Sequence, residues 1–180
     1  MVKRHLVIAV LTGALALVAC DDPVETGRSI VTVSQFNSGS PVQSDVLFDD
    51  GTSAYVPEDL IMCIFTSRPY NAYVTGFVRD AVMIDTYTIT WERIDGGTGA
   101  LPTRTEACAI YVTHADDTDA EIRLVTWEDK GGPILSPLVG SANQIRMRAT
   151  IEFHGREVGS TAEIESAITV DVNFADTVNT

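Results

Sequence analysis

The chain has 180 residues, of which 45% are hydrophobic, and a formal net charge of −13. This length suits a single domain with a proper apolar core. The acidic balance repels nucleic acid phosphates and anionic lipid headgroups, which argues against both as partners.

The first twenty residues are organised like a secretory signal. Lys3, Arg4 and His5 form a basic head, and an apolar run follows from Leu6 to Leu17. This run is shorter than the ~20 apolar residues that a transmembrane helix needs. A charged head, a short apolar run and a small residue at its end are typical of a cleaved signal peptide.

The quartet Leu17-Val18-Ala19-Cys20 resembles the lipobox of bacterial lipoproteins. That resemblance implies cleavage before Cys20 and acylation of this cysteine; an ordinary signal peptide cut near Ala19 and an uncleaved anchor are the alternatives. Two or more acyl chains give stable membrane attachment. The implied location is the bacterial cell envelope, on the inner or outer membrane, with the protein facing the periplasm or the surface.

The sequence therefore divides into a signal peptide (1–19), a lipidated tether (20–28) and one domain (29–180). Removal of residues 1–19 leaves 10 basic and 25 acidic residues, a formal charge of −15. The segment "DDPVETGR" after Cys20 is polar and short, so the domain is expected to stay close to the membrane.

From Ser29 onward the hydrophobic pattern has the period of two that marks half-buried strands. The clearest runs are "SIVTVSQF", "DTYTITWERI", "EIRLVTWE", "IRMRATIEFH" and "AITVDVNFAD". The run "LIMCIF" (60–65) is apolar at every position, which predicts a central strand covered on both faces. "VLF" (46–48) and "PILSPLVG" (133–140) are weaker candidates for short or edge strands, and a short helix is one option for residues 70–83.

About seven to nine strands separated by turn signals, without βαβ alternation, predict an all-β fold with a single antiparallel β-sandwich or barrel. "YTITWERIDGG" and "GREVGSTAEIESAITVDVNFAD" resemble strands of Ig-like domains in bacterial envelope proteins, many of which have no assigned activity. The resemblance implies an Ig-like sandwich.

With Cys20 assigned to lipid, two cysteines remain, each inside a strongly apolar strand. In an oxidising compartment Cys63 and Cys108 can form a disulfide. Free cysteine also packs readily as a small buried hydrophobe. Both alternatives stay open at this point.

No catalytic motif is present in the sequence. His114 and His154 lie in no recognisable nucleophile–base pattern, there is no G-x-S-x-G, and there is no phosphate-binding loop. Paired carboxylates could serve a hydrolase, but nothing in the sequence brings two of them to one cleft. We therefore expect a protein that is not an enzyme and has no cofactor.

The segment "HADDTDAE" is the one concentration of carboxylates. Asp116, Asp117, Asp119 and Glu121 could supply oxygen ligands to calcium. The same aspartates would also suit an ordinary hairpin turn. Calcium or small-ligand binding at this turn is the alternative function.

Two aromatic residues are expected to point outward on neighbouring strands, namely Tyr111 and Trp127. They could form a recognition patch or merely cover a sheet edge. The leading hypothesis is a lipid-anchored envelope module that acts by binding or structural association. Its partners would be the membrane, through acyl chains on Cys20, and an envelope protein or glycan.

Overall fold

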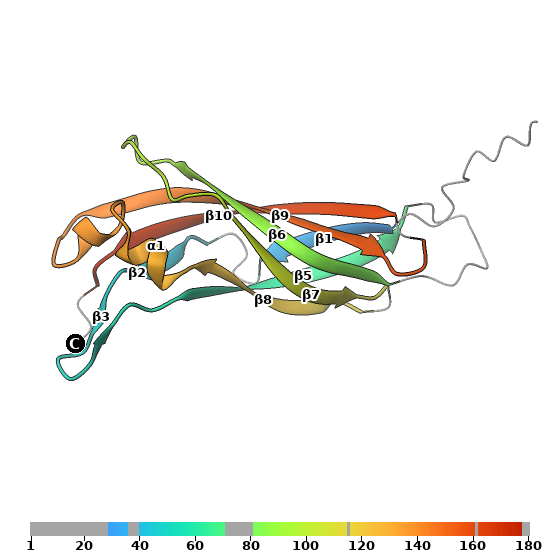
Figure 1. Cartoon of the computed structure of the whole chain (residues 1–180), viewed down its shortest axis with the longest axis horizontal. Coiled ribbons are helices and arrows are strands. Elements are labelled where there is room, and N and C mark those ends of the chain that lie inside the picture. Colours follow the sequence, from blue (N-terminus) through green and yellow to red (C-terminus); the bar gives the residue numbers. More distant parts are fainter. Residues whose placement is uncertain (1–28, 36–39, 71–80, 115, 161, 178–180) are drawn as a thin grey trace, which may run out of the picture.

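The computed structural model describes residues 29–35, 40–70, 81–114, 116–160 and 162–177. The predicted signal peptide, the tether with Cys20, and most of the ambiguous segment 70–83 lie outside these residues. The described chain is mostly β, as predicted, and forms an elongated body (Figure 1). Its strands are β1 (Ser29–Gln35), β2 (Val42–Asp45), β3 (Phe48–Asp49), β4 (Ala54–Tyr55), β5 (Asp59–Pro69), β6 (Val82–Arg93), β7 (Arg104–Val112), β8 (Thr118–Val125), β9 (Gln144–Glu157) and β10 (Glu163–Ala175).

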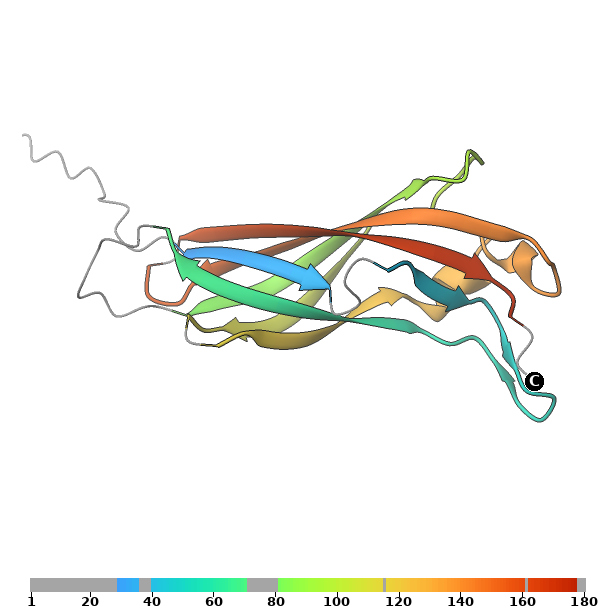
Figure 2. The same ribbon diagram turned by 180° about the vertical axis from the view of Figure 1, so that it is seen from behind.

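Two larger sheets face each other, and a small hairpin, β3–β4, projects from one end. One sheet has the order β2-β10-β9-β6-β7, and the other has the order β1-β5-β8. At one edge β1 lies beside β10, which brings the two sheets together there (Figure 2). The side chains between the sheets form one core, in which the rings of Phe65 and Phe153 meet edge to face at 5.0 Å.

The pairing departs from the predicted all-antiparallel arrangement at one place. β2 pairs with β10 in parallel, with Val42 opposite Val172. Parallel neighbours need a long crossover connection, and here almost the whole domain separates the two strands. No local turn signal can reveal such a pairing, because the partners are so distant in sequence.

The strongest alternating segments form the centre of the larger sheet. On β9 the apolar residues point into the core and the intervening ones point outward or lie at the rim, as predicted. β10 behaves in the same way, with Val170, Val172 and Phe174 buried. Each alternation matches the pleat, so a one-residue slip of register would turn these apolar side chains toward solvent.

β5 is the central strand of its sheet, but the prediction that it is covered on both faces is wrong. Ile61, Cys63 and Phe65 are buried, whereas Leu60 is 53% exposed. The three-stranded sheet presents only one face to the core. The described part of the chain places no second layer on its other face.

The predicted strand at 133–140 is also wrong, and the predicted strand at "EIRLVTWE" ends before Trp127. Trp127 begins the short helix α1 (Trp127–Gly131). Thr126 and Asp129 form a capping box at the N-terminus of this helix. Residues 136–138 form the 3-10 helix η1 (Ser136–Leu138). Two prolines within "PILSPLVG" disfavour a strand, and Leu135 and Leu138 are buried against the core instead.

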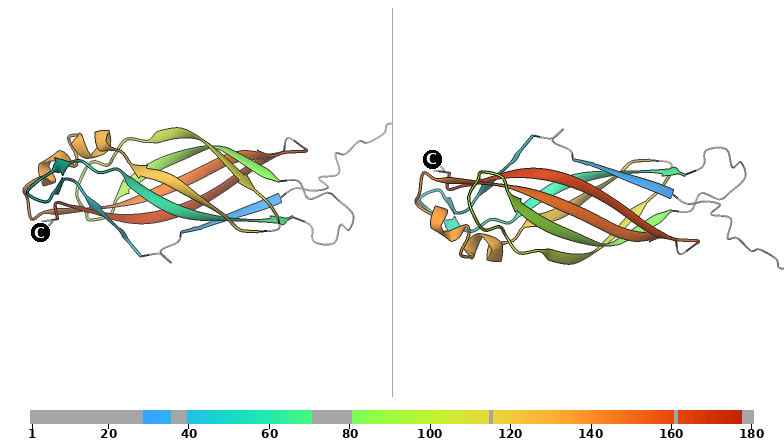
Figure 3. Two further views of the ribbon diagram at one scale, coloured as in Figure 1. Left: turned by 90° about the horizontal axis from the view of Figure 1, so that it is seen from below. Right: turned by 90° about the horizontal axis from the view of Figure 1, so that it is seen from above.

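The long axis of the domain has two distinct ends, seen from two sides in Figure 3. The proximal end is where Ser29 of β1 pairs with Pro69, and the distal end is where Asp59 of β5 pairs with Val125. α1 and the β3–β4 hairpin lie at the distal end (Figure 1). The described chain therefore starts at one end of the body and finishes, after β10, at the other.

One glycine is required by a close approach between two strands. The register between β6 and β9 shifts between Ile84 and Thr86, so β6 bulges at Asp85. Gly155 of β9 lies opposite this bulge. A Cβ atom at Gly155 would lie 2.2 Å from the Met83 carbonyl oxygen and 2.7 Å from the Cα of Ile84. Both atoms belong to the backbone, so no side chain can rotate away to make room.

We expect the substitution Gly155→Ala to lower the free energy of unfolding by about 1–3 kcal/mol, because the added methyl group forces the two strands apart. Urea unfolding followed by circular dichroism measures this change. The matched control is Gly131→Ala at the end of α1, where a Cβ meets nothing within 4 Å. This control should change stability by no more than about 0.5 kcal/mol. Equal stability of the two variants would contradict the close approach.

Candidate functional site

A buried lysine at the distal end is the centre of the first polar cluster. We call Lys130, Asp59, Ser44 and Asp45 the Lys130 cluster. Lys130 is only 1% exposed. Its Nζ donates to the Asp45 carbonyl oxygen at 2.7 Å and to Asp59 Oδ1 at 3.0 Å. Ser44 Oγ donates to the other oxygen of the same carboxylate, Asp59 Oδ2, at 2.5 Å.

Burial disfavours the charged forms of both side chains in this pair. It raises the pKa of Asp59 above its ordinary value, although the Ser44 hydrogen bond and the Lys130 charge act in the opposite direction. It lowers the pKa of Lys130, and here the Asp59 and Asp45 carboxylates oppose the shift. The environment therefore favours a neutral amine and a neutral carboxyl more than water does.

The sequence analysis missed this cluster. Lys130 is the only lysine after residue 19, and that isolation was the one available signal. Lys130 lies on α1, whereas the other residues of the cluster come from β2 and from the start of β5. These three elements are distant in sequence.

A second polar cluster lies at the proximal end around His114. We call Ser29, Ser67, His114, Glu157 and Ser160 the His114 cluster. Ser29 Oγ lies 3.1 Å from His114 Nε2, and Ser67 Oγ lies 2.9 Å from His114 Nδ1. The buried carboxylate of Glu157 accepts hydrogen bonds from the Ser29 backbone N–H and from Ser160 Oγ.

The His114 cluster contains serine and histidine at hydrogen-bond distance, but its hydrogen bonds connect strands rather than form a catalytic triad. Both ring nitrogens of His114 are occupied by serines, so no carboxylate orients the ring as in hydrolytic triads. Ser29 and Ser67 are both buried, and Ser29 also lines a pocket that borders the start of β10. The cluster instead ties β1, β5 and the β9–β10 turn together.

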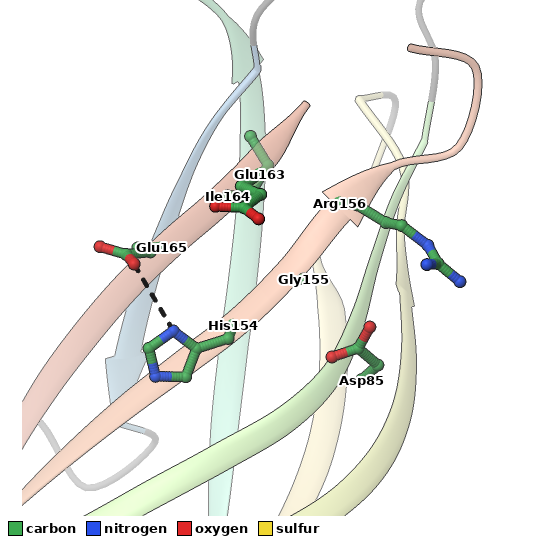
Figure 4. A pocket seen from close by; sticks show the side chains of 7 residues that line it. All are labelled: Asp85, His154, Gly155, Arg156, Glu163, Ile164 and Glu165. Carbon is green, nitrogen blue, oxygen red and sulfur yellow. Dashed lines mark ion pairs between the residues drawn. The ribbon is translucent and has the colours of Figure 1, made fainter. Parts of the chain in front are cut away.

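His154, the other histidine of the domain, lines a shallow pocket on β9 and β10 with a volume of about 350 Å³. Its Nδ1 is 3.7 Å from Glu165 Oε1; the Glu165 side chain is largely exposed, at 78%, whereas that of His154 is 40% exposed. Figure 4 shows Arg156 pointing away from this pair. Groups that could act together on one substrate do not converge here.

The four carboxylates of the alternative calcium site come from two parts of the chain. Asp116 and Asp117 precede β8, whereas Asp119 and Glu121 lie on it as exposed residues of one face. Alternate residues of a strand are about 7 Å apart and share one face, whereas the other two carboxylates come from the loop before the strand. Asp117 Oδ1 accepts a hydrogen bond from Thr66 at 2.6 Å. Among the described residues, no three His, Cys, Asp or Glu side chains are grouped to hold a metal.

Of the two alternatives for Cys63 and Cys108, the structure contains the free thiols. Cys63 lies on β5 and Cys108 on β7, so they belong to opposite sheets. Burial raises the pKa of Cys63 to about 12. Burial also raises the pKa of Cys108, with a further contribution from the charge of Asp85.

Of the two alternatives for Tyr111 and Trp127, the structure does not form the common recognition patch. Arg104 at the start of β7 binds Asp129 of α1 at 2.5 Å, which places Trp127 at the distal end. Tyr111 is seven residues further along β7, about 23 Å away. The two side chains are similarly exposed, at 57% for Trp127 and 52% for Tyr111.

Exposed apolar side chains are nevertheless present on the distal end. Tyr55 of the β3–β4 hairpin, Trp127 of α1 and Val139 after η1 are all exposed. Val139 lines an open groove of about 490 Å³ together with Leu47 and residues of the β3–β4 turn. The Tyr55 ring packs on Phe48 at 4.9 Å, which holds it in a defined position. The distal end thus presents aromatic and apolar side chains on loops and short elements.

Comparisons with protein families, with curated proteins and with solved structures find no match for this chain. None of the helices in the described part has the length and apolar character needed to cross a bilayer.

We expect Cys63 to resist iodoacetamide in the folded protein at mildly alkaline pH, because its thiol is buried and stays protonated. Cys108, which is half-buried, should react measurably. Unfolding in urea without reductant should make both cysteines react, as shown by mass spectrometry of the peptides. Recovery of a linked Cys63–Cys108 peptide from the unreduced protein would contradict the free thiols.

Proposed function

We propose that this protein is a bacterial envelope lipoprotein with an Ig-like β-sandwich domain that holds a binding surface away from the membrane. It is attached through acyl chains on Cys20 and acts by binding a protein or glycan rather than by catalysis. The supporting observation is that the described chain begins at the proximal end, whereas two of its exposed aromatic residues, Tyr55 and Trp127, lie on short elements of the distal end.

The dimensions agree with this orientation. The eight residues between Cys20 and Ser29 span at most about 28 Å when extended, so the proximal end would sit near the lipid. β10 has 13 residues and covers about 43 Å at the usual rise of a strand. The distal end would therefore face outward, beyond the headgroups.

The chemistry of the distal end suits recognition. Aromatic residues dominate the energetics of protein interfaces, and loops at one end of a rigid scaffold commonly carry binding function. The formal charge of −15 without residues 1–19 disfavours an anionic partner. We therefore expect a neutral or basic protein surface, or an uncharged glycan.

Replacing Cys20 by alanine should abolish incorporation of radiolabelled palmitate and release the protein from the membrane fraction. Acyl chains supply the attachment in this proposal, and the variant has none. The matched control is Cys63→Ala, which removes a buried thiol and should leave both labelling and fractionation unchanged. A wild-type protein without label, together with a Cys20→Ala protein that still sediments with membranes, would refute the lipid attachment.

Replacing Trp127 by alanine should reduce the amount of partner that co-purifies with the membrane-bound protein at least tenfold, which corresponds to about 1.4 kcal/mol. Tyr111→Ala is the matched control, because it removes a similarly exposed aromatic residue far from the distal end. It should leave co-purification unchanged. Equal loss in both variants, or no loss in either, would contradict a distal binding surface.

A further inference from the structure

The Lys130 cluster holds a buried amine and a buried carboxyl group against each other through several hydrogen bonds. A lysine and an aspartate are withdrawn from water, although replacing such pairs with apolar residues is often neutral or stabilising. The two oxygens of Asp59 are held separately, Oδ1 by Lys130 Nζ and Oδ2 by the Ser44 hydroxyl. The Asp45 carbonyl oxygen holds a further N–H of Lys130. Amine and carboxyl are thus fixed in contact.

We propose that Lys130 and Asp59 condense into an intramolecular amide bond. The Nζ atom is 3.0 Å from Oδ1, and the carboxyl carbon lies one bond beyond this oxygen. Groups held in contact and in the right orientation react with effective molarities that no bimolecular encounter reaches. The hydrogen bond holds the amine beside the carboxyl group, and a short movement of Nζ from Oδ1 toward Cγ brings the reacting atoms together.

The reaction balances without any further reagent. The lone pair of the neutral Nζ attacks Cγ of the neutral Asp59 carboxyl group, and a C–N bond forms. Oδ2 becomes the oxyanion of the tetrahedral intermediate, where the Ser44 hydroxyl donates to it. The nitrogen loses a proton, Oδ1 receives one, and the bond from Cγ to Oδ1 breaks to release one water molecule. The proton that the nitrogen loses is the one that Oδ1 receives, so the step needs no further proton donor.

Burial favours the reactive protonation states. The pKa of Lys130 is lowered and the pKa of Asp59 is raised, in each case mainly by desolvation. A proton transfer within the pair gives the amine and the acid that the condensation needs. The low exposure of the site also limits the access of water that would hydrolyse the product.

The amide bond would connect two distant parts of the distal end. It would join the start of β5 to α1, which are 71 residues apart in sequence. A covalent link that closes so long a loop restricts the unfolded chain. It would also fix α1, and with it Trp127, to the scaffold. This inference does not depend on the lipid attachment or on the partner.

Peptide mass spectrometry of the denatured full-length protein tests the bond directly. Trypsin does not cleave after an acylated lysine or between Arg68 and Pro69. We therefore expect one branched species that joins peptide 29–79 to peptide 124–146 and is lighter than their sum by one water molecule. Fragmentation should locate the branch at Lys130 and Asp59.

Lys130→Arg is the matched control, because it keeps the positive charge and restores cleavage at position 130. It should yield the two chains separately, and Asp59→Ala should do the same. The wild-type result decides the proposal irrespective of how well these variants fold. Complete cleavage after Lys130 in the wild type, with peptide 29–79 at its unmodified mass, would overturn it and leave a buried ion pair.

Discussion

The packing of β5 against β9 is the contact on which the rest of the structure depends. Phe65 and Phe153 meet there inside the core, and burying each such side chain contributes about 1.5–3 kcal/mol. Neither sheet has another described layer to cover its apolar face, so each is stable only against the other. The alternation along both strands fixes the register that makes this packing possible. The ends of the domain, where both polar clusters lie, are positioned as a consequence.

The sequence predicted well those parts of the fold that local patterns encode. β6, β9 and β10 follow from alternation and β1 from its β-branched residues, and the all-β class follows from the number of strands and from the turn signals between them. Two segments show the limit of such patterns. "LIMCIF" is apolar on both faces, yet only one face is covered, because composition cannot say whether a second layer exists. "PILSPLVG" contains buried leucines in a turn and a 3-10 helix, since apolar residues can enter a core without forming a strand.

The two polar clusters were harder to predict from the sequence than the strands, for a related reason. The Lys130 cluster unites residues 44, 45, 59 and 130, and the His114 cluster unites residues from 29 to 160. Each is created by strand order and register, which no short window of sequence contains. The acidic segment 116–121 shows the converse, because its carboxylates are close in sequence but are divided between β8 and the loop before it, and the described residues form no metal-holding group there. Proximity in sequence was thus a poor guide to side chains that act together.

The placement of Ser29 determines how the domain would carry mechanical load. Ser29 is fixed to Glu157 of the opposite sheet, and β1 pairs with β5 over seven consecutive residues. Tension between a membrane anchor before Ser29 and a partner at the distal end would run parallel to these strands. The hydrogen bonds of the β1–β5 ladder would then be sheared together instead of opening one after another. A domain attached in this way resists pulling far better than one whose terminal strand is peeled from its edge.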